Sequence, residues 1–142
     1  MANNYQLAST PAYSDFPFFN YGTTDIPAGS HVTVDTTNTV GASQQGIGIT
    51  LPTADGQKTL GVTLDTIKAG TSGRVRCASP ISKTLADGSI TAGSYLMASG
   101  TAGKLGRSKA YAAGTGITCT GIALTTAVDG DEVLFLNVLS PA

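Results

Sequence analysis

Most of the chain after residue 30 consists of short hydrophobic runs separated by Gly, Asp, Asn or Pro. Residues 31–36 (HVTVDT) and 74–77 (RVRC) alternate apolar and polar positions, which is typical of a strand with one buried face. Residues 133–139 (VLFLNVL) form instead an apolar run of the kind that is buried on both faces of a sheet. Valine and threonine favour pleated structure, and the 18 glycines disfavour long helices. The pattern predicts an all-β domain.

An internal repeat supports this prediction. Residues 61–70 (GVTLDTIKAG) align without gaps to residues 121–130 (GIALTTAVDG). A second strand follows each copy, at residues 73–77 and 131–139, so the repeat predicts one hairpin unit used twice. A related turn sequence, in which Gly supplies positive φ, begins at Ile26, Ile67 and Ile90. Repeats of this length indicate architecture rather than chemistry.

The first thirty residues have a different character. They contain three of the six prolines and show neither a helical nor an alternating period. Proline fixes its own φ and restrains the preceding residue to extended geometry. We therefore expect residues 1–30 to form an extended arm and residues 31–142 to form a single β-domain. Six of the nine aromatic residues lie in this segment: Tyr5, Tyr13, Phe16, Phe18, Phe19 and Tyr21.

Length and charge exclude several classes of function. A chain of 142 residues has room for one domain of ordinary size. Charged residues make up 12% of it, about half of the roughly 25% usual in soluble domains, and the net charge is -1. Nucleic-acid binding is therefore not expected, because little positive charge is available for phosphates. No apolar stretch approaches the roughly 20 residues of a membrane span, and no secretory signal is visible. We expect synthesis in a cytoplasm, with Cys77 and Cys119 reduced.

Candidate catalytic and metal-binding residues are few. His31 is the single histidine and has no cysteine or acidic partner nearby in the sequence. Serine nucleophile motifs are absent, and a nucleophile needs a base. Asp129, Asp131 and Glu132 form a short acidic group that fits a tight hairpin turn better than a calcium loop of twelve residues. We expect no enzymatic activity, no cofactor and no metal site.

Residues 81–97 (ISKTLADGSITAGSYLM), residues 121–124 (GIAL) and residues 129–133 (DGDEV) resemble the small capsid cement, or head decoration, proteins of tailed bacteriophages. The resemblance covers residues 45–139. It implies a compact β-tulip or small β-barrel that assembles as homotrimers on the outer capsid surface of the virion. There it would clamp neighbouring subunits of the phage major capsid protein in the expanded head, without catalytic residues. The aromatic arm is a departure from many short members of that family.

The aromatic arm is the candidate binding site. Burying one phenylalanine contributes roughly 1.5–3 kcal/mol, so several exposed rings favour a docked state. The arm either folds back on its own domain or lies across a partner, and the turn at residues 25–29 favours the partner. The predicted capsid and subunit interface consists of Tyr5, Tyr13, Phe16, Phe18, Phe19 and Tyr21.

A second class of function stays open. A carbohydrate-binding or adhesive β-module of a phage tail fibre or surface appendage would stack exposed Tyr95 and Tyr111 on sugars. Sugar binding by the isolated protein would separate this alternative from capsid decoration.

Overall fold

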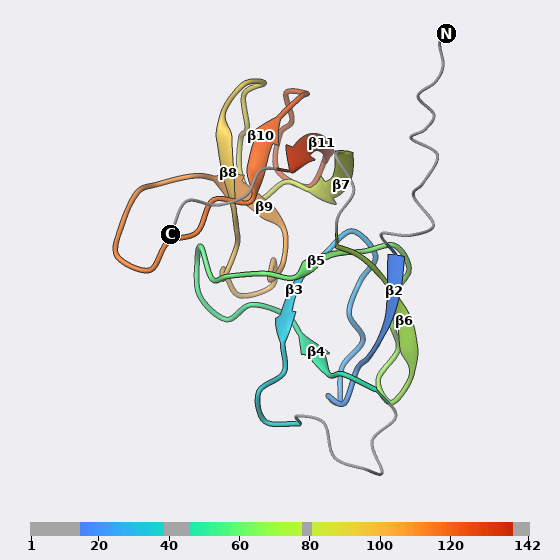
Figure 1. Ribbon diagram of the computed structural model, residues 1–142. Helices are drawn as coiled ribbons and strands as arrows, with labels where there is room; N and C mark the ends of the chain where they lie inside the picture. Colours follow the sequence, from blue (N-terminus) through green and yellow to red (C-terminus); the bar gives the residue numbers. More distant parts are fainter. Residues whose placement is uncertain (1–14, 39–45, 78–80, 138–142) are drawn as a thin grey trace, which may run out of the picture.

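The computed structural model describes residues 15–38, 46–77 and 81–137, and every regular element within these ranges is a β-strand (Figure 1). The prediction of an all-β protein is confirmed. The strands are β2 (Asp15–Phe19), β3 (His31–Val34), β4 (Ile49–Thr50), β5 (Gly61–Thr63), β6 (Ser72–Arg76), β7 (Ile81–Leu85), β8 (Tyr95–Ala98), β9 (Ser108–Ala110), β10 (Gly121–Ala123) and β11 (Glu132–Asn137).

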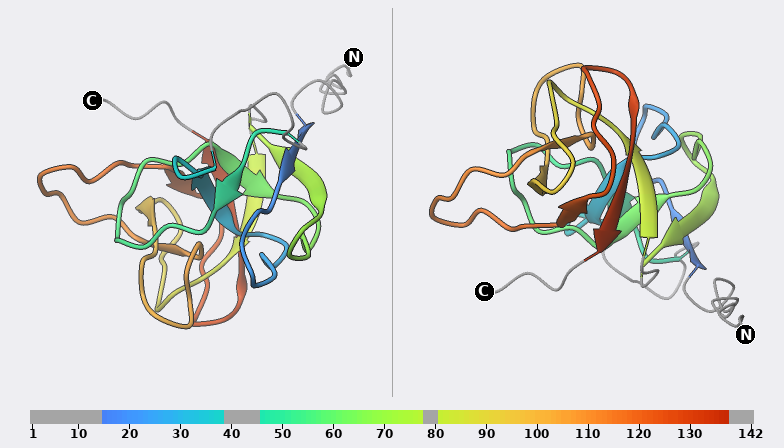
Figure 2. Two further views of the ribbon diagram at one scale, coloured as in Figure 1. Left: turned by 90° about the horizontal axis from the view of Figure 1, so that it is seen from below. Right: turned by 90° about the horizontal axis from the view of Figure 1, so that it is seen from above.

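The strands form two five-stranded sheets, one from each half of the chain. The first sheet has the order β2-β6-β5-β3-β4 and the second has the order β7-β11-β10-β8-β9. All pairs of neighbouring strands are antiparallel. Figure 1 shows the second sheet, coloured yellow to red, above the first, coloured blue to green, and the views from below and from above in Figure 2 look along this stack, so that the two sheets overlap.

The two sheets repeat one topology. Each strand from β2 to β6 has a counterpart from β7 to β11, in the same chain order and at the same place in its sheet. The predicted hairpins are β5–β6 and β10–β11, so the repeat read from the sequence is confirmed. An isolated antiparallel bridge also recurs, as Ile26 with Ile67 and as Ile90 with Ala127. The structural repeat therefore includes the whole of each half and not the hairpin alone.

Glycine is required at two equivalent positions in the repeat. A Cβ at Gly61 would overlap the carbonyl oxygen of Arg76, and a Cβ at Gly121 would overlap that of Leu136. Both glycines begin the first strand of their hairpin, where the partner strand passes directly over the Cα atom. Any larger residue would push the two strands apart, which explains why both copies of the repeat begin with glycine.

Two apolar clusters make up the core. The first lies within the first half and contains Val32, Val75 and Ile67 together with Ile26 and Ile49. The second contains Phe135, Val133 and five other residues of the second half, joined by Val62 from β5. Because side chains alternate along a strand, Val62 lies on the opposite face of the first sheet from Val32 and Val75. The first sheet is therefore buried on both faces. The outer face of the first sheet, which carries Val62, packs against the inner face of the second sheet, and we call this arrangement back-to-front stacking.

Residues 15–30 belong to the body of the protein, contrary to the prediction of an arm. Asp15–Phe19 pairs along its whole length with Ser72–Arg76, and Ile26 is a core residue. Pro17 is compatible with this strand because β2 lies at an edge of the sheet, where a missing N–H breaks no ladder. The predicted boundary at residue 30 is wrong for residues 15–30, and residues 1–14 lie outside the described part of the chain.

Candidate interaction surface

The outer face of the second sheet carries a row of apolar side chains across four strands. The pairing register places Ile81 of β7 beside Leu136 of β11, Leu136 beside Ile122 of β10, and Ile122 beside Tyr95 of β8. We call these four residues the outer row. Ile81 is 47% exposed, Leu136 37% and Tyr95 56%, while Ile122 is partly buried. A soluble protein rarely leaves such a contiguous apolar strip in water without using it.

Two further leucines extend this surface. Leu134 lies two residues before Leu136 on the same face of β11 and is 39% exposed. Leu124 donates its N–H to the Leu134 carbonyl at 2.8 Å and is 45% exposed. In its described part, up to residue 137, the predicted run is therefore not buried on both faces: Val133 and Phe135 lie in the core, and Leu134 and Leu136 face outward.

The equivalent row of the first sheet is covered. The same register there joins Asp15 of β2, Arg76 of β6, Val62 of β5 and His31 of β3. We call these residues the seam row, because the second half packs on Val62 and His31. Val62 is 3% exposed and His31 is 1% exposed. The Asp15 carboxylate holds the Arg76 guanidinium at 2.9 Å, with the two side chains 12% and 27% exposed. The covered row is thus more polar than the exposed one.

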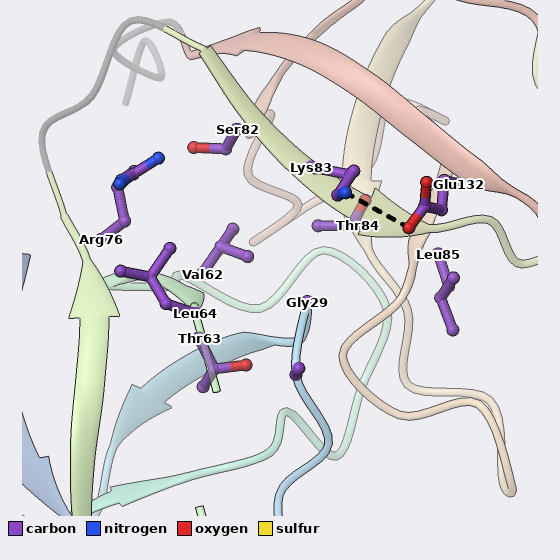
Figure 3. A pocket seen from close by; sticks show the side chains of 11 residues that line it. Gly29, Val62, Thr63, Leu64, Arg76, Ser82, Lys83, Thr84, Leu85 and Glu132 are labelled. Carbon is purple, nitrogen blue, oxygen red and sulfur yellow. Dashed lines mark ion pairs between the residues drawn. The ribbon is translucent and has the colours of Figure 1, made fainter. Parts of the chain in front are cut away.

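A cleft of about 310 Å³ lies along the seam (Figure 3). Val62, Leu64 and Arg76 line it from the first half, and Ser82 and Thr84 of β7 line it from the second. An ion pair between Lys83 and Glu132, 3.3 Å apart, crosses from β7 to β11 at its border. No cluster of catalytic groups converges on the cleft among the described residues that line it.

His31 is a structural residue of the seam. Its Nε2 lies 3.0 Å from the Ser108 hydroxyl, which in turn lies 2.6 Å from the Thr84 hydroxyl. Its ring packs on Phe135, with centroids 5.4 Å apart. Desolvation by burial lowers the pKa of His31 to about 4, so the ring is neutral at pH 7. Ser108 is completely buried as well, so this serine–histidine pair is closed to any substrate in solution.

The predicted aromatic interface is divided by the structure. Phe18 packs against the first core cluster, and Phe19 packs on Tyr21 with ring centroids 4.5 Å apart. The Tyr21 hydroxyl donates to the Gly46 carbonyl at 2.7 Å. Phe16 is 46% exposed on β2 and is the one of these four residues with a large exposed ring. Tyr5 and Tyr13 lie outside the described residues.

Two lysines of the second half are paired with carboxylates. Lys104 lies 2.8 Å from Asp129, and Lys109 lies 2.8 Å from Asp55. The hydrogen bond from Lys104 is the main cause of a lowered pKa at Asp129. Where the chain is described, no group of three His, Cys, Asp or Glu residues is placed to hold a metal ion. The same part of the chain has no helix long and apolar enough to cross a membrane.

The register and the burial define an all-β protein of two stacked, repeated sheets. By sequence, no protein-family model and no curated protein matches the chain. By structure, the chain is similar to the head fiber gp8.5 N base of bacteriophage phi29, with a TM-score of 0.66 and 16% sequence identity. The likeness covers 90% of this chain and 96% of the phi29 chain. At this identity it establishes a shared fold, which extends over both halves of the molecule.

Proposed function

We propose that this chain is a structural component of a bacteriophage head, a decoration protein that binds the outside of the capsid and stabilises the lattice of the major capsid protein. The observation that carries the proposal is the fold, shared over 90% of the chain with a head fiber base of phage phi29. The resemblance of residues 81–97, 121–124 and 129–133 to phage cement proteins points to the same setting.

The surface chemistry supports a role in binding rather than catalysis. The single histidine is buried against Ser108, and the acidic residue Asp129 is engaged by Lys104. What the described surface offers is exposed apolar area, at Phe16 on β2 and along the outer row of the second sheet. A protein of this kind acts through contact geometry, and no turnover is needed.

The proposed mechanism is multivalent attachment. Copies of the chain associate, as homotrimers, and each copy contacts neighbouring capsid subunits. Residues 1–14, with Tyr5 and Tyr13, are proposed to reach the lattice. Each contact is modest on its own, but simultaneous contacts at a symmetric site act at a high effective concentration and hold the shell against internal pressure.

The test is decoration of purified phage heads. Expanded heads that lack the protein are mixed with it, and bound protein is measured by co-sedimentation before the heads are heated. We expect saturable binding and greater heat resistance of the decorated heads. A variant lacking residues 1–14 is expected to remain folded and to bind more weakly. Absence of saturable binding to heads of the phage that encodes the chain would refute the proposal.

Two tyrosines favour the carbohydrate alternative. Tyr95 is 56% exposed, and the N–H of Tyr111 donates to its carbonyl at 2.9 Å, so the two residues lie side by side on neighbouring segments. Exposed rings stack on sugar faces. Sugar binding by the isolated protein that disappears in Tyr95→Ala, together with failure to decorate heads, would favour this function instead.

A further inference from the structure

The outer row of the second sheet is the more apolar of two equivalent rows and yet the more exposed. Its four residues are Ile81, Leu136, Ile122 and Tyr95, where the covered seam row has Asp15, Arg76, Val62 and His31. Burial normally selects the apolar set and exposure the charged set, because water solvates charges and excludes hydrocarbon. The reversal indicates that the outer row is covered in the working state of the protein.

The molecule itself shows what covers such a row. The seam row packs on the inner face of the following sheet, where Val62 joins Phe135 and Val133 in one cluster and His31 contacts Ser108. The covering surface is thus the inner face of a half of this same fold. The edge strand of that half, β7, contributes Ser82 and Thr84 to the cleft along the seam.

The inner face of the first half is filled by its own core cluster, but its edge strand β2 exposes an apolar residue beside that cluster. Ser82 pairs with Phe135 in the second sheet, and Phe16 pairs with Val75 in the first, so Phe16 occupies on β2 the position that Ser82 occupies on β7. Ser82 is 5% exposed under the seam, whereas Phe16 is 46% exposed. The first half therefore exposes a large apolar ring at the position where the second half has a small, covered serine.

We propose that the outer row binds a second copy of this chain at the surface of β2 that carries Phe16. We call this surface the β2 face, and the Phe16 ring of the second copy packs against the outer row. The contact uses, on the first half of the second copy, the edge-strand position that corresponds to Ser82 at the seam within one chain. The inference rests on the proposed function for its setting and deepens it by naming the subunit contact. A net charge of -1 leaves little repulsion between copies. Such a contact uses different surfaces on its two sides, so copies add head to tail, into a ring where the rotation closes and into an open filament where it does not.

The test is the mass of the full-length protein in solution, measured by sedimentation equilibrium from about 1 μM to about 1 mM. We expect the wild-type chain to associate. Tyr95→Arg and Leu136→Arg place a charge in the outer row, and Phe16→Arg places one on the opposite surface. Each is expected to weaken association at least about tenfold. Val128→Arg is the matched control, because Val128 is 59% exposed in the same half but lies outside the strands, where its carbonyl accepts from the Asp131 N–H, and it should associate like wild type.

Mixing identifies the geometry of the contact. The Tyr95→Arg variant keeps an intact β2 face and the Phe16→Arg variant keeps an intact outer row, so an equimolar mixture should form a dimer that neither variant forms alone. Thermal unfolding of each variant confirms that it is folded, and Tyr95→Arg replaces Leu136→Arg if the latter is not. A wild-type chain that stays monomeric overturns the proposal, as does association that survives Phe16→Arg. No phage heads are present, so failure to decorate heads leaves this result unaffected.

Discussion

The two halves of the molecule share one topology but differ in how they are buried. The first sheet has apolar clusters on both faces, whereas the second has one on its inner face and exposes Leu134 and Leu136 on the other. The hairpins β5–β6 and β10–β11 have the same register, so the backbone does not cause the difference. The difference lies in what packs next to each half: the second half covers the first, and nothing in the described chain covers the outer row.

The comparison shows that a repeated backbone unit can serve two roles through a few side chains. At equivalent positions the first half has Arg76 and His31 and the second has Leu136 and Tyr95. In the first half His31 contacts Ser108 and Phe135 across the seam, and Arg76 pairs with Asp15 beside it. In the second, Leu136 and Tyr95 form an apolar surface. Substitutions at matched positions in the two halves should therefore have unequal effects.

The largest expected effect is at Phe135, the residue on which the halves meet. It is completely buried and contacts the His31 ring. Phe135→Ala should lower the free energy of unfolding by about 3–5 kcal/mol, because the cavity opens in the shared core. Leu134→Ala, one residue away on the exposed face, should change it by no more than about 0.5 kcal/mol. Denaturant unfolding of dilute protein measures both, and equal losses would contradict the assignment of faces.

Alanine at the two equivalent glycines tests whether the repeat is one packing unit. Gly61→Ala and Gly121→Ala should each cost about 1–3 kcal/mol, because the new Cβ overlaps a carbonyl oxygen of the paired strand. Gly114→Ala is the control, since its Cβ meets only the Ile117 side chain, at 3.1 Å. Thermal unfolding gives the comparison. A neutral result at one of the two glycines would show that the hairpins are not equivalent.

The pH dependence of stability isolates the seam. The folded pKa of His31 is lowered from 6.5 to about 4, so between these values the unfolded chain binds more protons than the folded one. The free energy of unfolding should therefore fall as the pH is lowered from about 6.5 toward 4, by at most about 1.4 kcal/mol per pH unit for this one proton. His31→Gln should remove most of this slope above pH 5. An unchanged slope in that variant would assign the effect to other groups.

The smallest effect compares two ion pairs of the first half. Asp15→Asn should cost about 1 kcal/mol, because Asp15 holds Arg76 in a partly buried pair beside the seam. Asp65→Asn should leave stability unchanged within error, since Asp65 and Arg74 are 48% and 60% exposed and water screens their attraction. Urea unfolding in low and high salt checks the ranking. Equal losses of unfolding free energy in the two variants would indicate that water screens the Asp15–Arg76 pair as strongly as the Asp65–Arg74 pair.

Sequence alone predicted the class of fold and the repeated hairpin. Short runs bounded by glycine determine both, and the copies at residues 61–70 and 121–130 keep enough identity to be aligned. The full repeat could not be recognised in the sequence, because the edge strands β2 and β7 have diverged: β2 reads DFPFF and β7 reads ISKTL. Only their equal places in the two sheets show that they correspond.

The candidate site was harder to predict. Pro17 suggested a segment outside any sheet, but an edge strand tolerates proline, so Phe18 became a core contact and not a free ring. The outer row could not be found from local pattern, because Ile81, Tyr95 and Leu136 are far apart in the chain and meet only through strand pairing. The one signal was the apolar run that begins at residue 133, in which Leu134 and Leu136 are exposed.

The stacking of one sheet behind another also gives the molecule a polarity. The second sheet lies above the first (Figure 1), and the outward face of the second sheet exposes Leu134 and Leu136. Because the two ends of the molecule differ, turning it over would present a different surface to its neighbours. Every copy that attaches through the same contact must point the same way, so a single local fit fixes the orientation of a whole layer.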